Sequence, residues 1–404
     1  MGTAEKPIVF TSLLDDEYGG DTNNDNAATI PKPGDWRSIK ISADGSVFEH
    51  ATLRYGGLED PSGSFWANMR IEDASAVIKN SVIEHAQNYG LLLKNSTSTI
   101  ESNTIRLNNR NVPGMTPGTG MIINGGAPSI LKNTFSKNTV GLVIYGGASS
   151  KIEENNFTDN IQEAIQSNGA YPTFTGNTAQ NNGTNGVLLS GELDRDYELS
   201  SNLTYIIPNS YVTPEGKNLT IKAGTILKLM GTGLMLVRGK LNAKGTVDKK
   251  IVFTSINDDE YGGDTNANGT STTPVPNDWL HLTIKNGTGT STLEHAVVRY
   301  GGNKPVFSAP LGALHIKNST IEIKNTTVEK NYFLGISMEN ANSVVINDSL
   351  IKDHSDPGPE TFFGIYLTAS STPTIQNTSF KNNETHIFTD GTSSFIDGGG
   401  NSFE

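Results

Sequence analysis

Residues 132–135 read KNTF, residues 154–157 read ENNF and residues 176–179 read GNTA, each segment starting 22 positions after the one before. The same pattern, an apolar residue two or three positions after an asparagine, recurs at Ile83, Ile105, Phe135, Phe157 and Ala179. The one longer step, from Ile105 to Phe135, contains a Pro- and Gly-rich insertion at 111–118. Short alternating apolar runs with a period near 22 predict a parallel β-solenoid with one coil per repeat.

The second half of the chain repeats this arrangement. Val328, Ile351 and Phe380 are 23 and 29 positions apart, with an insertion at 354–360, and the first step, Phe48 to Ile83 or Leu293 to Val328, is 35 in both halves. Hexapeptide solenoids would need about 18 residues per coil, so the right-handed form is favoured. The asparagines before the apolar positions are expected to adopt the left-handed conformation and to stack their amides as an internal ladder; they are Asn80, Asn103, Asn133, Asn155 and Asn177.

A larger repeat lies above this period. The string DDEYGGDTN occupies 15–23 and returns unchanged at 258–266, and IVFTS, EHA and RYGG recur around it. We therefore predict an all-β fold of two tandem homologous modules, 1–196 and 197–404, the second with its opening coils at 205–244. A single uninterrupted solenoid is the alternative. The first module begins partway through the pattern of the second, so the chain is expected to be a piece of a longer protein.

Composition restricts the partners. The formal net charge is −12, no basic run is visible and no cysteine is present. Nucleic acid and anionic membranes attract Lys/Arg patches, so neither is expected as a partner. Disulfides and thiolate metal sites are excluded. No apolar run approaches the roughly 20 residues of a membrane span, so no membrane insertion is expected within this segment.

The repeated acidic string has the chemistry of a hard-cation site. Asp21, Asn23 and Asp25 supply oxygens at positions 1, 3 and 5, as in an EF-hand loop, but the twelfth position is Lys32 in one copy and Val275 in the other. The loop is therefore no EF-hand, and the other carboxylates must complete the set. Calcium tolerates irregular oxygen geometry better than magnesium does, so we predict at least one Ca²⁺ per module. The candidate ligands are Asp15, Asp16, Asp21, Asn23, Asp25, Asp35, Asp258, Asp259, Asp264, Asn266, Asn268 and Asp278. A solvated loop whose Asp, Asn and Gly only make turns is the alternative.

These motifs resemble the right-handed parallel β-helices of the pectate-lyase-like superfamily. Within it, the chain looks like tandem modules of large bacterial extracellular proteins that carry calcium loops of the form DD.YGGDTN.DG. The close match covers 2–57 and 217–302. The resemblance implies the fold, calcium and an extracellular or cell-surface location. It does not imply one activity, because that superfamily contains lyases, hydrolases, adhesins and structural shafts.

The main functional prediction is a non-catalytic, calcium-stabilised β-helical segment with a structural or adhesive role. No catalytic residue is assigned, because Arg54 and Arg299 follow the same pattern in both modules and are expected to form structural ion pairs. The alternative is a polysaccharide lyase or hydrolase of the β-helix class, or a carbohydrate-binding module. Expected partners are a polysaccharide or cell-surface glycan, other copies or neighbouring modules. Aromatic residues are candidates for stacking on sugars: Phe65 with Trp66, Tyr332 with Phe333, and Phe362 with Phe363.

Overall fold

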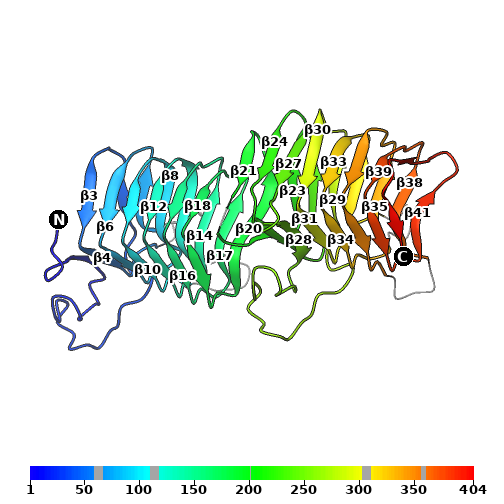
Figure 1. Ribbon diagram of the computed structural model, residues 1–404. Coiled ribbons are helices and arrows are strands. Elements are labelled where there is room, and N and C mark those ends of the chain that lie inside the picture. The colour runs from blue at the N-terminus through cyan, green and yellow to red at the C-terminus, as the bar shows by residue number, and fades with distance from the viewer. Residues whose placement is uncertain (59–66, 110–117, 201, 303–310, 356–360) are drawn as a thin grey trace. The chain divides into compact units, whose positions relative to one another are not determined.

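The computed structural model describes residues 1–58, 67–109, 118–200, 202–302, 311–355 and 361–404. The regular elements of these residues are β-strands that pair in parallel with strands one coil away (Figure 1). The described residues contain no helix long and apolar enough to cross a membrane. The chain divides into two compact units, Met1–Val187 and Leu188–Glu404. The predicted module boundaries, 1–196 and 197–404, stay a prediction.

In the first unit each coil contributes one strand to each of three sheets. One sheet contains β1 (Ile8–Phe10), β4 (Ala51–Arg54), β7 (Val82–Glu84), β10 (Thr104–Arg106), β13 (Thr134–Ser136), β16 (Asn156–Thr158) and β19 (Thr178–Gln180). A second contains β3 (Ser46–Glu49), β6 (Ala76–Lys79), β9 (Thr99–Glu101), β12 (Ser129–Leu131), β15 (Lys151–Glu153) and β18 (Thr173–Thr175). The third contains β2 (Ile39–Ile41), β5 (Ala67–Glu72), β8 (Tyr89–Ser96), β11 (Thr119–Gly126), β14 (Val140–Tyr145) and β17 (Glu163–Asn168), and β20 (Thr184–Glu192) follows.

The second unit repeats this three-sheet arrangement. One sheet contains β21 (Tyr197–Leu199), β24 (Asn218–Ile221), β27 (Lys240–Lys244), β30 (Thr290–Glu294), β33 (Thr320–Lys324), β36 (Val344–Asn347), β39 (Thr374–Gln376) and β42 (Ile396–Asp397). The next contains β22 (Tyr205–Ile207), β25 (Ile226–Leu229), β28 (Ile251–Ser255), β31 (Ala296–Arg299), β34 (Thr327–Glu329), β37 (Leu350–Lys352), β40 (Ser379–Lys381) and β43 (Ser402–Phe403). The last contains β23 (Ser210–Thr213), β26 (Leu234–Val237), β29 (His281–Lys285), β32 (Leu314–Lys317), β35 (Leu334–Glu339), β38 (Phe363–Thr368) and β41 (Thr385–Thr389).

The strand register confirms the predicted parallel β-helix. In the first unit the predicted apolar positions pair in one stack, in the order Ile83, Ile105, Phe135, Phe157 and Ala179. In the second unit Val328 pairs with Ile351, which pairs with Phe380. The rings of Phe135 and Phe157 lie 4.8 Å apart and nearly parallel, so the core is built from like residues stacked at the spacing of neighbouring strands.

The prediction that Phe48 precedes Ile83 in the same stack is wrong, because the two residues belong to neighbouring sheets. Ile83 pairs with Leu53, whereas Phe48 pairs with Ile78 in the neighbouring sheet. The second unit has the same pattern, because Val328 pairs with Val298 and Leu293 pairs with Ile323. The shared spacing of 35 was real, but it joined residues of two different sheets.

The predicted asparagine ladder is present for four of its five residues. Asn103, Asn133, Asn155 and Asn177 are buried, and each of the first three donates its side-chain amide to the next at 3.0–3.1 Å. Asn80 is instead exposed, with φ of 51°. Ser81 occupies the first position of the ladder, where its main-chain N–H donates a hydrogen bond to the side-chain oxygen of Asn103. The expected left-handed conformation belongs to the preceding residues, such as Lys132 with φ of 56° and Glu154 with φ of 53°.

A second buried ladder was not predicted. It runs through Asn108, Asn138, Asn160 and Asn182, with amide-to-amide distances of 2.7–3.1 Å. Each asparagine in it also donates to a main-chain carbonyl of the coil below. The predicted insertion at 111–118 falls outside the described residues except for Gly118, and most of the insertion at 354–360 does so too.

Candidate functional site

A groove of about 460 Å³ lies on the outer surface of the last sheet of the second unit. Outward-facing positions of β26, β29, β32 and β35 form it, because alternate residues of a strand point away from the core. Lys285 of β29 pairs with Lys317 of β32, so basic side chains recur along the groove, whereas Thr283 pairs with His315. The lining residues are Leu234, Leu236, Arg238, His281, Thr283, Lys285, Leu311, His315, Lys317 and Glu339.

Two imidazoles form part of the groove lining. His315 is 6% exposed, and its Nδ1 lies 2.9 Å from the hydroxyl of Ser337. That hydroxyl also accepts the N–H of Gly312, which fixes its position. Burial, and then the neighbouring His281, lower the pKa of His315 to about 4. Burial lowers the pKa of His281 as well. Both rings are therefore neutral at pH 7 and can accept a proton.

The groove also carries positive charge that the described residues do not neutralise. Lys317 forms an ion pair with Glu339. Arg238 and Lys285 have no ion-pair partner among the residues that the structure describes. Glu339 is the single carboxylate among the lining residues. The groove thus offers two unpaired cations and two neutral imidazoles to a ligand, a combination suited to a polar anion.

Sequence reasoning missed this groove. The signal was present as a pattern, because Thr283-Ile284-Lys285 and His315-Ile316-Lys317 place polar, apolar and basic residues at the same positions of successive coils. The pattern indicates a groove only when the outward positions of neighbouring coils are aligned with one another. The predicted aromatic sites lie elsewhere: Phe65 and Trp66 fall outside the described residues, Phe333 is buried, and Phe363 contacts Tyr366 and Phe388 edge-on.

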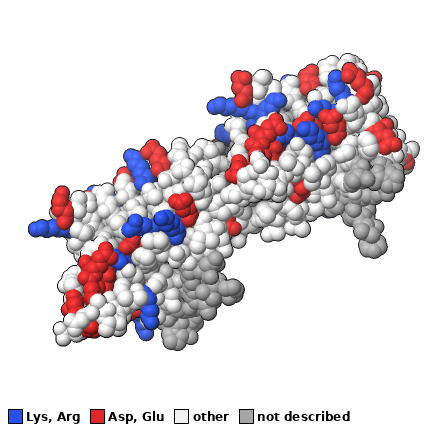
Figure 2. Space-filling model, turned by 90° about the horizontal axis from the view of Figure 1, so that it is seen from below, with Lys and Arg blue, Asp and Glu red and all other residues white. Residues whose placement is uncertain are grey.

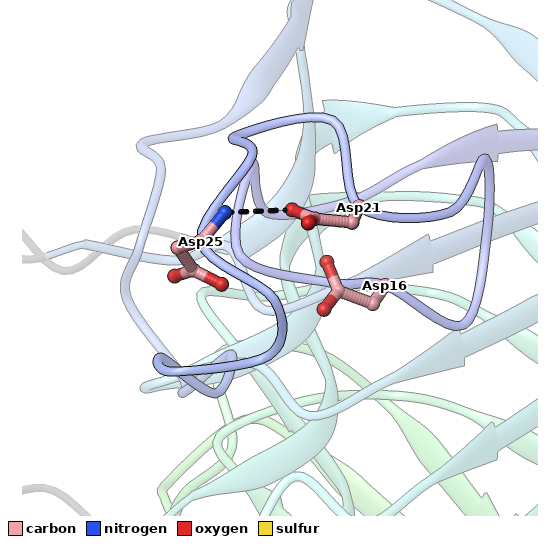
Figure 3. Close-up of side chains that lie close together, drawn as sticks. All are labelled: Asp16, Asp21 and Asp25. Carbon is pink, nitrogen blue, oxygen red and sulfur yellow. Dashed lines mark hydrogen bonds between the residues drawn. The ribbon is translucent and has the colours of Figure 1, made fainter.

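The first acidic loop leaves the coils between β1 and β2 (Figure 1, blue). Asp16, Asp21 and Asp25 each offer a carboxylate oxygen, and these oxygens lie within 4.8 Å of one another (Figure 3). The Asp21 carboxylate accepts the main-chain N–H groups of Asp25 and Asn26 at 3.0 and 2.9 Å. Gly19 and Gly20, with φ of 86° and 75°, allow the turn that leads into Asp21.

The loop leaves oxygens available for a cation. Asp16 Oδ1 and Asn23 Oδ1 are buried and have no hydrogen-bond partner among the described residues. Partial burial, and then the carboxylates of Asp21 and Asp25, raise the pKa of Asp16. The Thr29 hydroxyl, the first of several donors, lowers the pKa of Asp25. Buried oxygens without donors next to three carboxylates fit a hard cation.

The second loop, between β28 and β29, repeats the geometry with fewer carboxylates. The Asp264 carboxylate accepts the N–H groups of Asn268 and Gly269 at 3.0 and 2.9 Å. Asp259 Oδ1, Asn266 Oδ1 and Asn268 Oδ1 are buried without a partner among the described residues. Asn268 stands where the first loop has Asp25, so this loop has one carboxylate fewer.

The remaining predicted ligands bind other groups. The Arg54 guanidinium contacts Asp15 at 3.4 Å and Glu17 at 2.7 Å. The Arg299 guanidinium contacts Asp258 at 2.6 Å and Glu260 at 2.8 Å. The predicted structural ion pairs are therefore present, and Asp15 and Asp258 serve them. The carboxylates of Asp35 and Asp278 accept hydrogen bonds from the hydroxyls of Ser12 and Ser255, which ties the end of each loop to its beginning.

Surface charge is mixed. On the face drawn in Figure 2, Lys and Arg lie among Asp and Glu and form no continuous basic surface. The formal net charge of −12 agrees with this distribution. Neither observation favours a nucleic-acid interface on that face.

Comparisons with known proteins concern the fold. The family described as "right handed beta helix region" matches residues 66–204 and 276–404. No curated protein matches the sequence. A catalytic domain of a GH87 alpha-1,3-glucanase in complex with tetrasaccharides is similar at 13% identity and a TM-score of 0.40, covering 99% of this chain and 69% of the other. The catalytic unit of a GH87 alpha-1,3-glucanase from Streptomyces thermodiastaticus has 16% identity and a TM-score of 0.27, with coverages of 91% and 62%. The A-module of the mannuronan C-5 epimerase of Azotobacter vinelandii has 8% identity and a TM-score of 0.32, with coverages of 89% and 91%.

The predicted non-catalytic rod with a structural or adhesive role is corrected by these findings. The similar structures are catalytic domains of alpha-1,3-glucanases and a module of a mannuronan C-5 epimerase, which are polysaccharide-active enzymes as in the alternative prediction. At these identities and TM-scores the likeness transfers neither a substrate nor a catalytic residue to this chain.

Proposed function

Because the chain belongs to the right-handed β-helix family, we propose that it acts on a polysaccharide bound in the groove formed by β26, β29, β32 and β35. The observation that carries the proposal is the pair of unneutralised cations, Arg238 and Lys285, beside the neutral imidazoles of His281 and His315. Cations on successive coils are about 4.8 Å apart, which is close to the length of one sugar residue. An acidic polysaccharide is the ligand that such a groove would bind best.

The chemistry of the groove favours elimination over hydrolysis. Glycoside hydrolysis commonly uses two carboxyl groups about 5–9.5 Å apart, and the groove lining has only Glu339. In β-elimination a base removes the proton from the sugar carbon next to the uronate carboxylate. The electron pair forms a C=C bond, the bond to the glycosidic oxygen breaks, and that oxygen takes a proton. Lys285 and Arg238 would neutralise the carboxylate, and His315 is the base we assign.

The low pKa of His315 fits this role only with the ligand bound. In the free protein burial holds the ring neutral. A carboxylate bound beside it would raise its pKa, because a nearby negative charge stabilises the imidazolium. The substrate would thereby strengthen the base that attacks it.

The test combines binding with product analysis. Polygalacturonate, alginate and a neutral glucan are offered to the wild type and to Lys285→Gln, with Lys324→Gln, an exposed lysine of β33, as the matched control. We expect binding of a polyuronate that weakens with salt and falls about tenfold or more in Lys285→Gln alone. Ultraviolet absorbance of the new C=C bond reports cleavage. Equal binding of all three polymers, or no binding of any, would refute the proposal.

We further propose that the acidic loops bind Ca²⁺, which supports a location outside the cell, where weak calcium sites are filled. Asp16, Asp21, Asn23 and Asp25 would hold the ion in the first loop, and its charge would neutralise the three carboxylates. The support is the pair of buried oxygens on Asp16 and Asn23 that have no hydrogen-bond partner within the described part of the chain. Self-association and docking to neighbouring modules stay predictions.

A further inference from the structure

A buried lysine, Lys228, contacts the second acidic loop. Lys228 lies on β25, one coil before the strand that leads into the loop, and it is 0% exposed. Its ammonium group donates a hydrogen bond to the carbonyl of Gly263 at 2.6 Å. Gly263 directly precedes Asp264, whose carboxylate organises the loop.

The charge of Lys228 is compensated by this loop. The carboxylates of Asp259, Asp258 and Asp264 all favour its protonated form and oppose the effect of burial, which lowers its pKa to about 8. A buried ammonium group is stable only where acceptors and negative charge surround it. The ammonium group and the loop therefore stabilise each other, as a bound cation and its ligands do.

Two sequence differences between the loops also make the second loop less dependent on a bound cation than the first. Asn268 replaces Asp25 of the first loop, so Lys228 faces a site with one carboxylate fewer. Asn257 occupies the position of Leu14, and its Oδ1 accepts hydrogen bonds from Asn266 at 3.2 Å and Thr272 at 3.0 Å. The first loop has no such link through Leu14, whose side chain carries no polar atom. The second loop is thus held by side chains of its own.

We propose that Lys228 is a tethered cation of the second loop, so that the two copies are unequal metal sites. The first loop, with three carboxylates, binds Ca²⁺ tightly. The second, with two carboxylates and an ammonium group, binds it weakly. This inference rests on the calcium binding proposed above, and affinity at such sites follows the charge of the ligand set.

The direct test is a calcium titration of the full chain by isothermal titration calorimetry. The wild type should show one tight site and a second that is weaker by at least about tenfold. Lys228→Met, which keeps the length of the side chain, should tighten the second site by a similar factor. Asp25→Asn, which gives the first loop the residue of the second, should weaken only the tight site.

Asn268→Asp provides an independent check, because it restores the missing carboxylate at a partly exposed position where folding is not at risk. It should also tighten the second site. Circular dichroism and the urea midpoint establish that each variant is folded. Two equal sites in the wild type, or a second site unchanged in both Lys228→Met and Asn268→Asp, would overturn the inference while leaving calcium binding intact. No binding at either loop would overturn both.

Discussion

His354 interrupts an amide ladder, and replacing it with asparagine should stabilise the protein. In the first unit the main-chain N–H of Asn108 donates a hydrogen bond to the side-chain oxygen of Asn138. The side-chain amide of Asn138 in turn donates to the side-chain oxygen of Asn160. In the second unit Asn331 donates its N–H to His354 Nδ1 at 3.3 Å. There the ladder stops, because His354 Nε2 and Asn383 Oδ1 are both buried without a partner among the described residues.

The magnitude follows from the matching ladder. By analogy with Asn138, the new amide would donate to the main-chain carbonyl below and to Asn383 Oδ1. Two hydrogen bonds contribute about 1 kcal/mol each, and losing the larger imidazole costs about 1 kcal/mol in packing. His354→Asn should therefore raise the free energy of unfolding by about 1 kcal/mol at pH 8.

The gain should grow on acidification. Burial lowers the pKa of His354 to about 3, below the 6.5 of an unfolded histidine. The unfolded chain then binds the extra proton, so the stability of the wild type is complete above pH 6.5 and is lost as the pH falls towards 3. At pH 5 this loss is about 2 kcal/mol. The advantage of His354→Asn should reach about 3 kcal/mol there.

Urea unfolding followed by circular dichroism between pH 8 and pH 4.5 measures both parts. His354→Gln is the matched control: it cannot titrate, but its longer side chain does not fit the ladder. His354→Gln should remove the part of the pH dependence of the unfolding free energy that comes from this residue, but it should not raise the unfolding free energy at pH 8. An advantage of His354→Asn that stays constant with pH would refute the assignment of a buried neutral imidazole. A destabilised His354→Asn at pH 8 would refute the ladder argument.

Three further outcomes are expected. Asn155→Ala removes two hydrogen bonds that the side-chain amide donates and two that its oxygen accepts inside the first unit. Urea titration should show that the free energy of unfolding falls by about 2–4 kcal/mol. Thr158→Ala on the neighbouring strand should change it little. Arg299→Met leaves the buried Asp258 carboxylate unpaired and should cost about 3–5 kcal/mol, part of which Asp258→Asn should restore in the double variant. A calcium chelator should lower the melting temperature of the wild type by several degrees and that of Asp21→Asn by less; equal shifts would speak against the first loop as the site.

The coil architecture could be predicted because a solenoid repeats its chemistry at a fixed interval. Phe135 and Phe157 occupy equivalent positions 22 residues apart, and the pairing follows directly from the spacing. The acidic loops could be predicted for the same reason, since the chain contains them twice. The error at Phe48 shows the limit: an interval identifies equivalent positions only when both residues belong to the same sheet.

The groove could not be predicted in this way, because it depends on outward side chains that differ from coil to coil. Leu236, Thr283, His315 and Ser337 occupy one outward column, and no two of them are alike. Lys228 escaped prediction for a related reason, since it faces an inserted loop that leaves the neighbouring coil. Positions that face the core are under the same packing constraint in every coil and therefore repeat. Positions that face solvent, or that meet an inserted loop, are free to diverge, so the residues that distinguish the two copies are the ones that can bind different ligands.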